Sequence, residues 1–462
     1  MLPGMRRRIL LVNPPIYDFA AYDFWLKPYG LLSVAGRLRG QAELFLFDYL
    51  ERRGDCGLKK PSEANPQSAI INPQSDRWGR GRFPCERIES PGPLQSIPRH
   101  FRRFGVPRTV FTDYLRERGP FACVLVQTMM TYWYPGVREV MEDVRLAWPD
   151  AKIVLGGNYA TLCPDHARGL GADLVVVGTD LQPLWRFLEM PHDDGQPALW
   201  EAYEPLRIGA IKLADGCPFR CSYCSVPRVY RGFEPRPLER SLAELELLAG
   251  RGAENVAFYD DALLFQADKV LVPFLTEVLR RGIHVKGSPT RNSALGGPNL
   301  HTPNALNARF LTAELADLMV RAGFKTFYLG FESASRQWQQ GTGDKVFSEE
   351  LARAVDHLLA AGADPVDITA YQIIGHPDSD IQELETSMRF VHSLGIRGML
   401  ADFSPIPGTP DGEACRQWVD LEEPLLHNKT AFPIFRLSFD EVNRLKDLQR
   451  TLNRPVAPRA SL

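Results

Sequence analysis

The chain has 462 residues, of which 44% are hydrophobic and 24% are charged, and its formal net charge is -2. These values are typical of a soluble globular protein, and the charge gives no reason to expect nucleic acid or an anionic membrane as a partner. No stretch of about 18 apolar residues occurs, so we expect no membrane span. The apolar run after the basic N-terminus is too short for a signal peptide. The sequence therefore predicts a cytoplasmic protein of about two or three domains.

The first part of the chain alternates short apolar runs with helical patterns such as Leu31–Leu38 and Val137–Ala147. Runs rich in Val, Ile, Leu and Phe predict buried parallel strands. They are Arg8–Val12, Ala42–Phe47, Val124–Gln127, Lys152–Leu155 and Leu174–Val177. This alternation predicts an α/β domain over residues 1–195, with a doubly wound parallel sheet of Rossmann type.

An insertion of about residues 54–105 interrupts this pattern. It is rich in Pro, Arg, Gly and Ser and shows no clear periodicity. A segment of this length without regular structure is uncommon inside a compact domain. We interpret it as an irregular, partly disordered surface insertion, and the alternative is a lid or a docking arm.

A second alternation of strands and helices predicts a partial (β/α)6 barrel of TIM type over residues 200–411. Its expected strands are Ile208–Leu213, Asn255–Tyr259, His284–Gly287, Thr326–Phe331, Asp367–Ile374 and Gly398–Phe403. Chemistry in such a barrel gathers at the C-terminal ends of the strands. Residues 412–462 are expected to form a short tail, with a helix at Phe439–Leu452.

Three of the eight cysteines lie within eight positions, directly after the first predicted barrel strand. The run is Asp215-Gly-Cys217-Pro-Phe-Arg-Cys221-Ser-Tyr223-Cys224. Three thiolates on one tight loop can bind three irons of a cubane and leave the fourth iron open. Thiolates also suit zinc, but a closed structural zinc site needs a fourth ligand nearby. The next cysteine and histidine along the chain are Cys415 and His284, so the spacing favours a 4Fe-4S cluster over a zinc scaffold.

This CxxxCxxC motif, with the aromatic Tyr223 before its last cysteine, resembles that of the radical S-adenosylmethionine (radical-SAM) superfamily. In that family the open iron binds the methionine part of S-adenosylmethionine (SAM). An electron from the cluster then cleaves the bond between C5′ and sulfur and yields a 5′-deoxyadenosyl radical. The resemblance implies an enzyme with a 4Fe-4S cluster and SAM, together with a reducing partner of the flavodoxin or ferredoxin type.

Two later acidic segments resemble SAM-binding parts of the same family. Asp260 and Asp261 follow the second barrel strand, where acidic residues of the family bind the methionine amino group. A role at a helix N-terminus is the alternative for each of them. The run Gly330-Phe-Glu332-Ser333 is similar to the family's Gly-x-Glu-Ser segment, which implies that Glu332 binds the ribose hydroxyls. A carboxylate suits this task because it accepts two hydrogen bonds.

The end of the fifth barrel strand resembles the adenine-binding part of the family. Gly375 would let the backbone approach the flat base closely, and Ile374 would cover its face. His376 departs from the apolar residue that many relatives carry at this point. We interpret His376 as a solvent-exposed loop residue rather than as a catalytic group.

A Rossmann-like domain before a radical-SAM barrel resembles the subgroup with an N-terminal cobalamin-binding-like domain. Gly156 and Gly157 follow the fourth strand, and paired glycines allow close approach of a ligand. Gln127 and Thr128 begin a segment placed where the corrin would sit. The subgroup's Asp-x-His-x-x-Gly run corresponds to Asp48-Tyr-Leu50, so Leu50 stands where the cobalt-ligating histidine would be. Cobalamin binding without an axial histidine and loss of the cofactor both stay open.

The leading functional hypothesis is methyl or radical transfer to an unactivated carbon of a small-molecule or peptide substrate. The first alternative is a radical-SAM enzyme of other chemistry, such as cyclisation, with a vestigial cobalamin domain. The second is an enzyme like the tRNA methylthiotransferases. That hypothesis is weakened because the N-terminal half lacks a second trio of closely spaced cysteines, and the C-terminus has no recognisable β-rich RNA-binding module.

Overall fold

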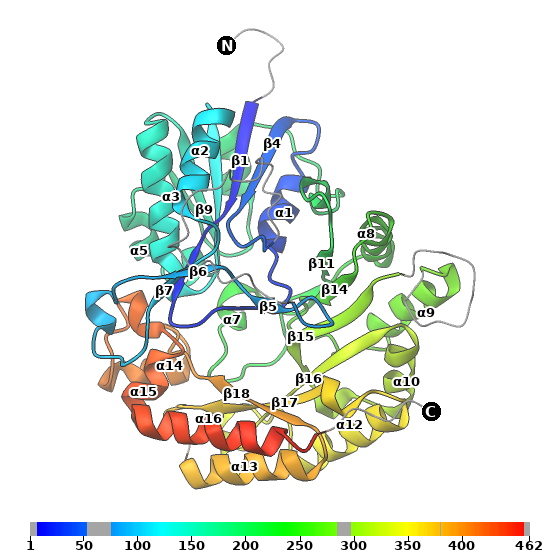
Figure 1. Cartoon of the computed structure of the whole chain (residues 1–462). Helices are drawn as coiled ribbons and strands as arrows, with labels where there is room; N and C mark the ends of the chain where they lie inside the picture. Colours follow the sequence, from blue (N-terminus) through cyan, green and yellow to red (C-terminus); the bar gives the residue numbers. More distant parts are fainter. Residues whose placement is uncertain (1–6, 53–74, 284–296, 379, 457–462) are drawn as a thin grey trace. The chain divides into compact units, whose positions relative to one another are not determined.

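A computed structural model describes residues 7–52, 75–283, 297–378 and 380–456 of the chain. The contacts divide the chain into two compact units (Figure 1): Met1–Glu204 with Asp420–Asn428, and Pro205–Val419 with Lys429–Leu462. Each unit is built on a sheet of parallel strands with helical connections, which confirms the predicted α/β class. Within the described ranges, no helix combines the length and apolar character that crossing a membrane requires.

The first unit contains a five-stranded parallel sheet in the order β10-β9-β8-β1-β4. Its strands are β1 (Arg7–Asn13), β4 (Ala42–Asp48), β8 (Cys123–Thr128), β9 (Lys152–Gly157) and β10 (Leu174–Val176). In chain order this is the 2-1-3-4-5 arrangement of a doubly wound sheet. The direction of winding reverses between β1 and β8. Ligands of such sheets bind at this reversal, outside the carboxyl ends of the strands.

Short helices connect the strands of the first unit. They are α1 (Tyr29–Gly36), α2 (Arg108–Arg118), η2 (Thr131–Trp133), α3 (Tyr134–Ala147), α4 (Asn158–Leu162), α5 (Pro164–Gly169), α6 (Gln182–Leu188), η3 (Trp200–Ala202) and η7 (Pro424–His427). The helix η7 comes from the C-terminal part of the sequence. Two buried hydrogen bonds hold its segment in this unit: His427 Nδ1 lies 2.9 Å from Thr131 Oγ1, and Asn428 donates to Asp18 at 2.9 Å.

The described part of the insertion is more regular than the sequence predicts. It contains β5 (Gly81–Arg82), β6 (Cys85–Arg87), η1 (Gly92–Leu94) and β7 (Arg102–Phe104). The strand β7 pairs with both β6 and β2 (Ile16–Asp18), and β5 pairs with β3 (Tyr22–Asp23). Strands of two or three residues are too short to show a periodicity, so no sequence pattern indicates them. Residues 53–74 of the insertion lie outside the described residues.

The second unit contains an open six-stranded parallel sheet in the order β11-β14-β15-β16-β17-β18. Its strands are β11 (Ile208–Ile211), β14 (Asn255–Phe258), β15 (Asn299–Asn307), β16 (Phe324–Glu332), β17 (Ile368–Ile374) and β18 (Arg397–Asp402). The six strands lie in the sheet in the same order as in the chain, as in a barrel that does not close. The predicted third strand, His284–Gly287, lies outside the described residues. The third strand of the sheet is β15, for which the sequence predicted no strand.

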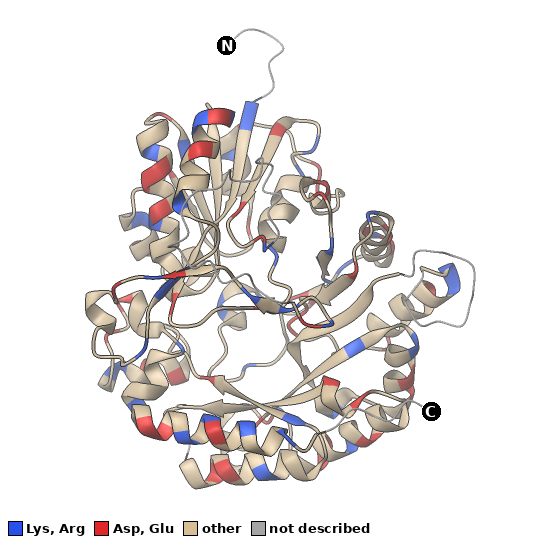
Figure 2. Cartoon of the chain, in the orientation of Figure 1, with Lys and Arg blue, Asp and Glu red and all other residues tan. Residues whose placement is uncertain are grey.

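Helices follow the strands of the second unit. They are α7 (Val226–Val229), α8 (Leu238–Gly250), α9 (Leu271–Arg281), η4 (Ala308–Phe310), α10 (Ala313–Arg321), α11 (Arg336–Thr342), α12 (Ser348–Ala360), η5 (Pro365–Asp367), α13 (Ile381–Ser393), α14 (Pro410–Ala414), η6 (Cys415–Gln417), α15 (Ala431–Leu437) and α16 (Phe439–Asn453). A small hairpin of β12 (Ala214–Asp215) and β13 (Glu234–Pro235) follows β11. Figure 2 shows charges of both signs interspersed on α13 and α16, as expected of solvated helix faces.

The packing of α3 on the loop after β1 requires a glycine. A Cβ atom on Gly136 would lie 1.9 Å from the carbonyl oxygen of Pro15, whereas a Cβ on Gly30 in α1 would have no neighbour within 4 Å. We therefore expect Gly136→Ala to lower the free energy of unfolding by about 1–3 kcal/mol, the usual effect of overpacking. Gly30→Ala is the matched control near the start of another helix and should not destabilise the fold. Thermal unfolding of both variants tests this, and equal midpoints would contradict it.

Candidate active site

The three motif cysteines lie on the loop between the β12 strand and α7, at the C-terminal end of β11. All three are free thiols and are partly buried. Two glycines let the backbone pack closely around this loop. A Cβ on Gly216, whose φ is +73°, would lie 2.0 Å from the carbonyl oxygen of Gly232. A Cβ on Gly343, whose φ is +121°, would lie 3.1 Å from Cys221 Cα.

The electrostatics of the loop keep the thiols protonated when no metal is bound. Burial raises the pKa of Cys217 and Cys221, and it raises the pKa of Cys224 to about 11. A bound metal deprotonates a coordinating thiol, so metal binding here would release protons. Within the described residues, no three Cys, His, Asp or Glu side chains are arranged to hold one metal ion. A cubane fits this loop better than one zinc ion would, because each thiolate binds a separate iron.

Glu332 ends β16 in a strained backbone conformation. Its φ is +68°, and the pairing of β16 with β17 shifts register between Gly330 and Glu332. A non-glycine residue in the left-handed region costs about 1–3 kcal/mol, and such strain often marks functional sites. The side chain is buried, and its Oε1 accepts a hydrogen bond from Lys345 Nζ at 2.7 Å.

Lys345 is a partly buried cation that sequence reasoning missed. Burial lowers the pKa of its ammonium group, but Glu332 together with Cys221 and Cys224 raises that pKa by more. Lys345 therefore stays charged and partly compensates the negative charge that thiolates would bring. In the sequence Lys345 belongs to no motif, so it carries no signal of a functional site.

The two predicted acidic residues after β14 have different surroundings. Asp260 is 3% exposed, and its Oδ1 accepts the backbone N–H groups of Leu213 and Ala214 at 2.9 and 2.7 Å. It thereby ties β14 to the chain that leaves β11, and burial raises its pKa to about 7. Asp261 instead lies 3.6 Å from the Lys212 ammonium, and its charge acts on Cys217. Asp261 is therefore the one that faces the cysteine loop.

The segment after β17 differs from the interpretation based on sequence. His376 is fully buried, so the prediction of a solvent-exposed loop histidine is wrong. Gly375 has a φ of +84°, and a Cβ there would lie 2.7 Å from Pro433 Cβ. Packing against α15 thus explains this glycine without a ligand. Ile374 is fully buried, and Tyr223 stacks on Trp338 at 6.1 Å between ring centroids.

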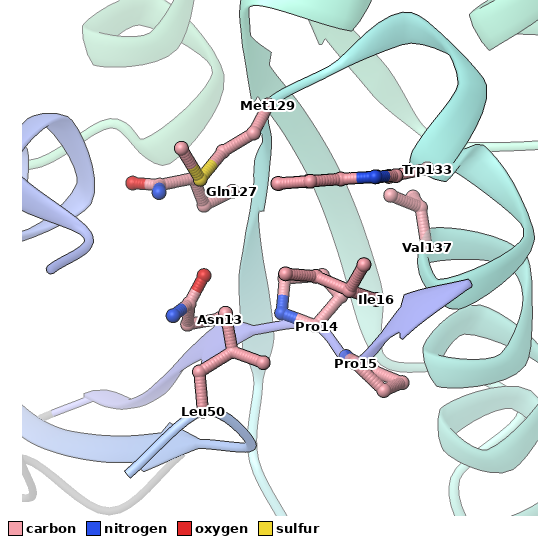
Figure 3. A pocket seen from close by; sticks show the side chains of 9 residues that line it. All are labelled: Asn13, Pro14, Pro15, Ile16, Leu50, Gln127, Met129, Trp133 and Val137. Atoms are coloured by element: carbon pink, nitrogen blue, oxygen red, sulfur yellow. The ribbon is translucent and has the colours of Figure 1, made fainter. Parts of the chain in front are cut away.

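The first unit holds a small pocket at the reversal point of its sheet (Figure 3). It is lined by Asn13, Pro14, Pro15, Ile16, Leu50, Gln127, Met129, Trp133 and Val137. Figure 3 shows Gln127, Met129 and Trp133 across the pocket from Asn13 and Leu50. Asn13 donates to Asp48 at 2.7 Å, and Gln127 accepts from the backbone of Leu31 at 3.3 Å. The pocket therefore presents apolar side chains and two amide groups, and none of its nine lining residues is a histidine.

Thr128, Gly156 and Gly157 are the other residues predicted to contact cobalamin. In the structure they contact one another. Thr128 Oγ1 donates to the Gly156 carbonyl oxygen and accepts from the Ala160 amide, both at 3.1 Å. A Cβ on Gly157, whose φ is +119°, would lie 2.1 Å from the Thr128 carbonyl oxygen. Close packing of β8 on β9 explains Gly157. The structure thus brings Gln127 and Leu50 to the pocket, but not Thr128, Gly156 or Gly157.

Comparison with known proteins finds a family match within the second unit. Residues 211–391 match the Radical SAM superfamily. The chain resembles the structure of TsrM from Kitasatospora setae, a radical SAM methyltransferase with cobalamin and a 4Fe-4S cluster bound: the TM-score is 0.64 at 16% identity, over 98% of this chain and 92% of that chain. OxsB, a cobalamin-dependent SAM radical enzyme, gives 0.54 at 13% identity, over 97% and 61%. At these identities, the likeness shows the fold.

Curated relatives match a shorter part of the chain. An uncharacterised methyltransferase of Synechocystis is 27% identical over 254 residues, which are 49% of this chain and 45% of the relative. The ribosomal protein uS12 methylthiotransferase RimO of Pelotomaculum thermopropionicum is 30% identical over 267 residues, or 55% and 56%. The chain spans about half the length of the curated relatives it matches.

The sequence match, the folds and the cysteine loop agree. Residues 211–391 form a radical-SAM domain, and this match supports an enzyme. Its whole fold resembles the subgroup that carries an N-terminal cobalamin-binding-like domain. The resemblance predicted from the sequence is therefore confirmed.

Substitutions of the two acidic residues separate a structural from a ligand-binding role. Asp260→Ala would leave the Leu213 and Ala214 amides unpaired, so we expect it to lower the free energy of unfolding by about 1–3 kcal/mol. Asp260→Asn keeps an acceptor oxygen and should restore most of that stability. Asp261→Ala is the matched control and should unfold near the wild-type midpoint. Chemical denaturation tests this order, and an Asp261→Ala variant as unstable as Asp260→Ala would contradict it.

Proposed function

We propose that this enzyme holds a 4Fe-4S cluster on Cys217, Cys221 and Cys224 and binds SAM at the open iron. We further propose that it transfers a methyl group or a radical to an unactivated carbon of a small molecule or a peptide. The observation that carries the proposal is the cysteine loop at the carboxyl ends of parallel strands, beside the ion pair of Lys345 with the buried Glu332. Such an enzyme needs a low-potential electron donor, such as a flavodoxin or a ferredoxin.

Different residues around the loop would contact different parts of SAM. When bound, the cluster supplies the electron that converts SAM to methionine and a 5′-deoxyadenosyl radical. Glu332 would accept hydrogen bonds from the ribose hydroxyls, and Asp261 would pair with the methionine amino group. Lys345 offers a cation that balances Glu332 and the thiolates, which keeps the burial of these charges tolerable. Burial of the Glu332 carboxylate shields it from water and strengthens such interactions.

Cobalamin binding is supported by the pocket of the first unit. A corrin has broad apolar faces and an amide rim. In the pocket, Leu50, Ile16 and Trp133 offer apolar surface to the faces of the corrin. Asn13 and Gln127 offer amide groups to its rim. The pocket is small, so it would contact only a part of the cofactor. Leu50 is 4% exposed and packs on Phe83 and Phe104 of the insertion, and its side chain offers no metal ligand.

Methylthiotransferase activity is the second candidate, favoured by the names of curated relatives. RimO of Pelotomaculum thermopropionicum and the tRNA methylthiotransferase MtaB of Thermotoga maritima match 55% and 59% of this chain. The MtaB match is 24% identical. Iron content distinguishes this candidate from the first proposal. A methylthiotransferase of this kind would carry a second iron–sulfur cluster, and its iron content would exceed that of one cubane.

Iron analysis of anaerobically reconstituted protein tests the cluster. We expect about four irons per chain and a broad charge-transfer absorbance, because one cubane has four irons. Replacing Cys217, Cys221 and Cys224 by alanine together should remove both. Cys163→Ala is a matched control for a partly buried cysteine away from the loop, and it should keep both. A triple variant that retains its iron would refute the assignment, and about eight irons would favour the methylthiotransferase.

Cobalamin binding is tested by spectroscopy of the purified protein with added hydroxocobalamin. Because Leu50 offers no donor atom, we expect the base-off form and a Co(II) electron paramagnetic resonance spectrum without nitrogen superhyperfine splitting. Leu50→His should introduce that splitting if the pocket lies below the corrin. Clear splitting in the wild type would mean that another histidine binds cobalt. No binding at tens of micromolar cobalamin would favour the vestigial domain.

A further inference from the structure

A chain of hydrogen bonds joins the cysteine loop to two segments that are distant in sequence. Ser222, which lies between Cys221 and Tyr223, donates from Oγ to Asp411 Oδ2 at 2.6 Å. Its carbonyl oxygen also accepts the Asp411 backbone N–H at 3.2 Å. The same carboxylate oxygen of Asp411 lies 2.7 Å from His376 Nε2. Asp411 therefore bonds to the loop through both its side chain and its backbone.

The protonation of His376 follows from its neighbours. Its Nδ1 faces the backbone N–H of Asp378 at 3.1 Å and the indole N–H of Trp338 at 3.3 Å. Both groups can only donate, so Nδ1 accepts and carries no proton. Nε2 then carries the ring proton and donates it to Asp411. Because the imidazole is held on both sides and is fully buried, it presents this donor in one fixed direction.

His376 also reaches the loop by a second route. The Trp338 indole lies edge-on to the His376 ring, with 5.1 Å between centroids, and it stacks on Tyr223 at 6.1 Å. Ser222 and Tyr223 are thus contacted from the same histidine, one through a hydrogen bond to Asp411 and one through an aromatic ring. Both belong to the turn that separates Cys221 from Cys224.

Asp411 carries a negative charge in this arrangement. Burial raises the pKa of its carboxyl group, but the hydrogen bonds from His376 and Ser222 outweigh burial and hold that pKa below its usual value. Two donors on one oxygen are what a carboxylate needs to stay ionised away from water. The charge lies one hydrogen bond away from a residue adjacent to Cys221.

We propose that His376 and Asp411 are positioning residues, which fix the turn between Cys221 and Cys224 and hold a negative charge that makes the cluster harder to reduce. This inference rests on the proposed cluster. Hydrogen bonding and charge near the sulfur ligands set the potential of an iron–sulfur centre. A fixed anion disfavours an added electron, and a rigid turn keeps the three thiolates in one geometry.

The charge is tested by Asp411→Asn. Its amide oxygen can replace Oδ2 as the acceptor for both Ser222 and His376, so the variant removes the charge and keeps the bonds. We expect unchanged iron content and, at one fixed potential, about a tenfold higher ratio of reduced to oxidised cluster, from the interaction of unit charges at an effective dielectric of about 20. Redox titration followed by electron paramagnetic resonance measures this ratio. An unchanged ratio at full iron content would overturn the electrostatic role.

The positioning role is tested on the metal-free protein by the rate at which iodoacetamide alkylates the three loop cysteines. We expect Ser222→Ala and His376→Asn each to raise the rate severalfold. The double variant should be no faster than the faster single variant, because both break one chain of contacts. Additive rates would overturn the chain. The alkylation experiment does not need the cluster. A wild type that binds no iron would therefore refute the proposed function, and the positioning role could still be measured by alkylation.

His301→Asn is the matched control. His301 is also fully buried, with its ring nitrogens 3.0 Å from Thr326 Oγ1 and 2.9 Å from Asn255 Oδ1, at the N-terminal ends of the same strands. We expect it to lower the thermal midpoint without changing alkylation or the redox ratio. If His301→Asn raised alkylation as much as His376→Asn does, the effect would be general loosening of the fold and the proposal would fail.

Discussion

The site depends on the irregular pairing of β16 with β17 where β16 ends. Regular pairing would continue the pleat, so that alternate residues faced opposite sides of the sheet. The register shift after Gly330 and the left-handed backbone of Glu332 turn its carboxylate toward Lys345 instead. That strain must be balanced elsewhere. The ion pair with Lys345 and the tightly packed cysteine loop supply the contacts that hold Glu332 in this conformation.

Close packing accounts for several glycines that resemble ligand-binding glycines in the sequence. At Gly157 and Gly375, the space that a side chain would need is occupied by Thr128 and Pro433 of the chain itself. A glycine with positive φ is required in both cases, whether or not a ligand is near. The same sequence pattern therefore arises from two physical causes, and only the structure distinguishes them. In the first unit, the pocket-lining Gln127 and Leu50 are better candidates for ligand contact.

Local features of the sequence predict most of the architecture and the cysteine loop. Apolar runs reveal strands such as β8 and β17, because burial on both faces demands continuous hydrophobicity. The strand β15 escapes prediction because Asn299–Asn307 includes His301, Pro303 and Asn304 and has no apolar run. Contacts between distant segments are also beyond a local pattern. Lys345 and Asp411 meet the loop only because parallel strands end at one edge of the sheet, and neither carries a sequence signal of its own.

Charge balance explains why these distant residues gather there. Bound thiolates would add negative charge to a region that already holds the carboxylates of Glu332, Asp261 and Asp411. Buried charges without partners are too costly for a folded chain. Each carboxylate has a different partner. Lys345 pairs with Glu332, and Lys212 lies near Asp261. Asp411 accepts hydrogen bonds from the neutral donors of Ser222 and His376. A neutral donor stabilises a carboxylate without cancelling its charge. Asp411 thus differs from the other two, since its negative charge stays unneutralised beside the loop and can act on whatever the loop binds.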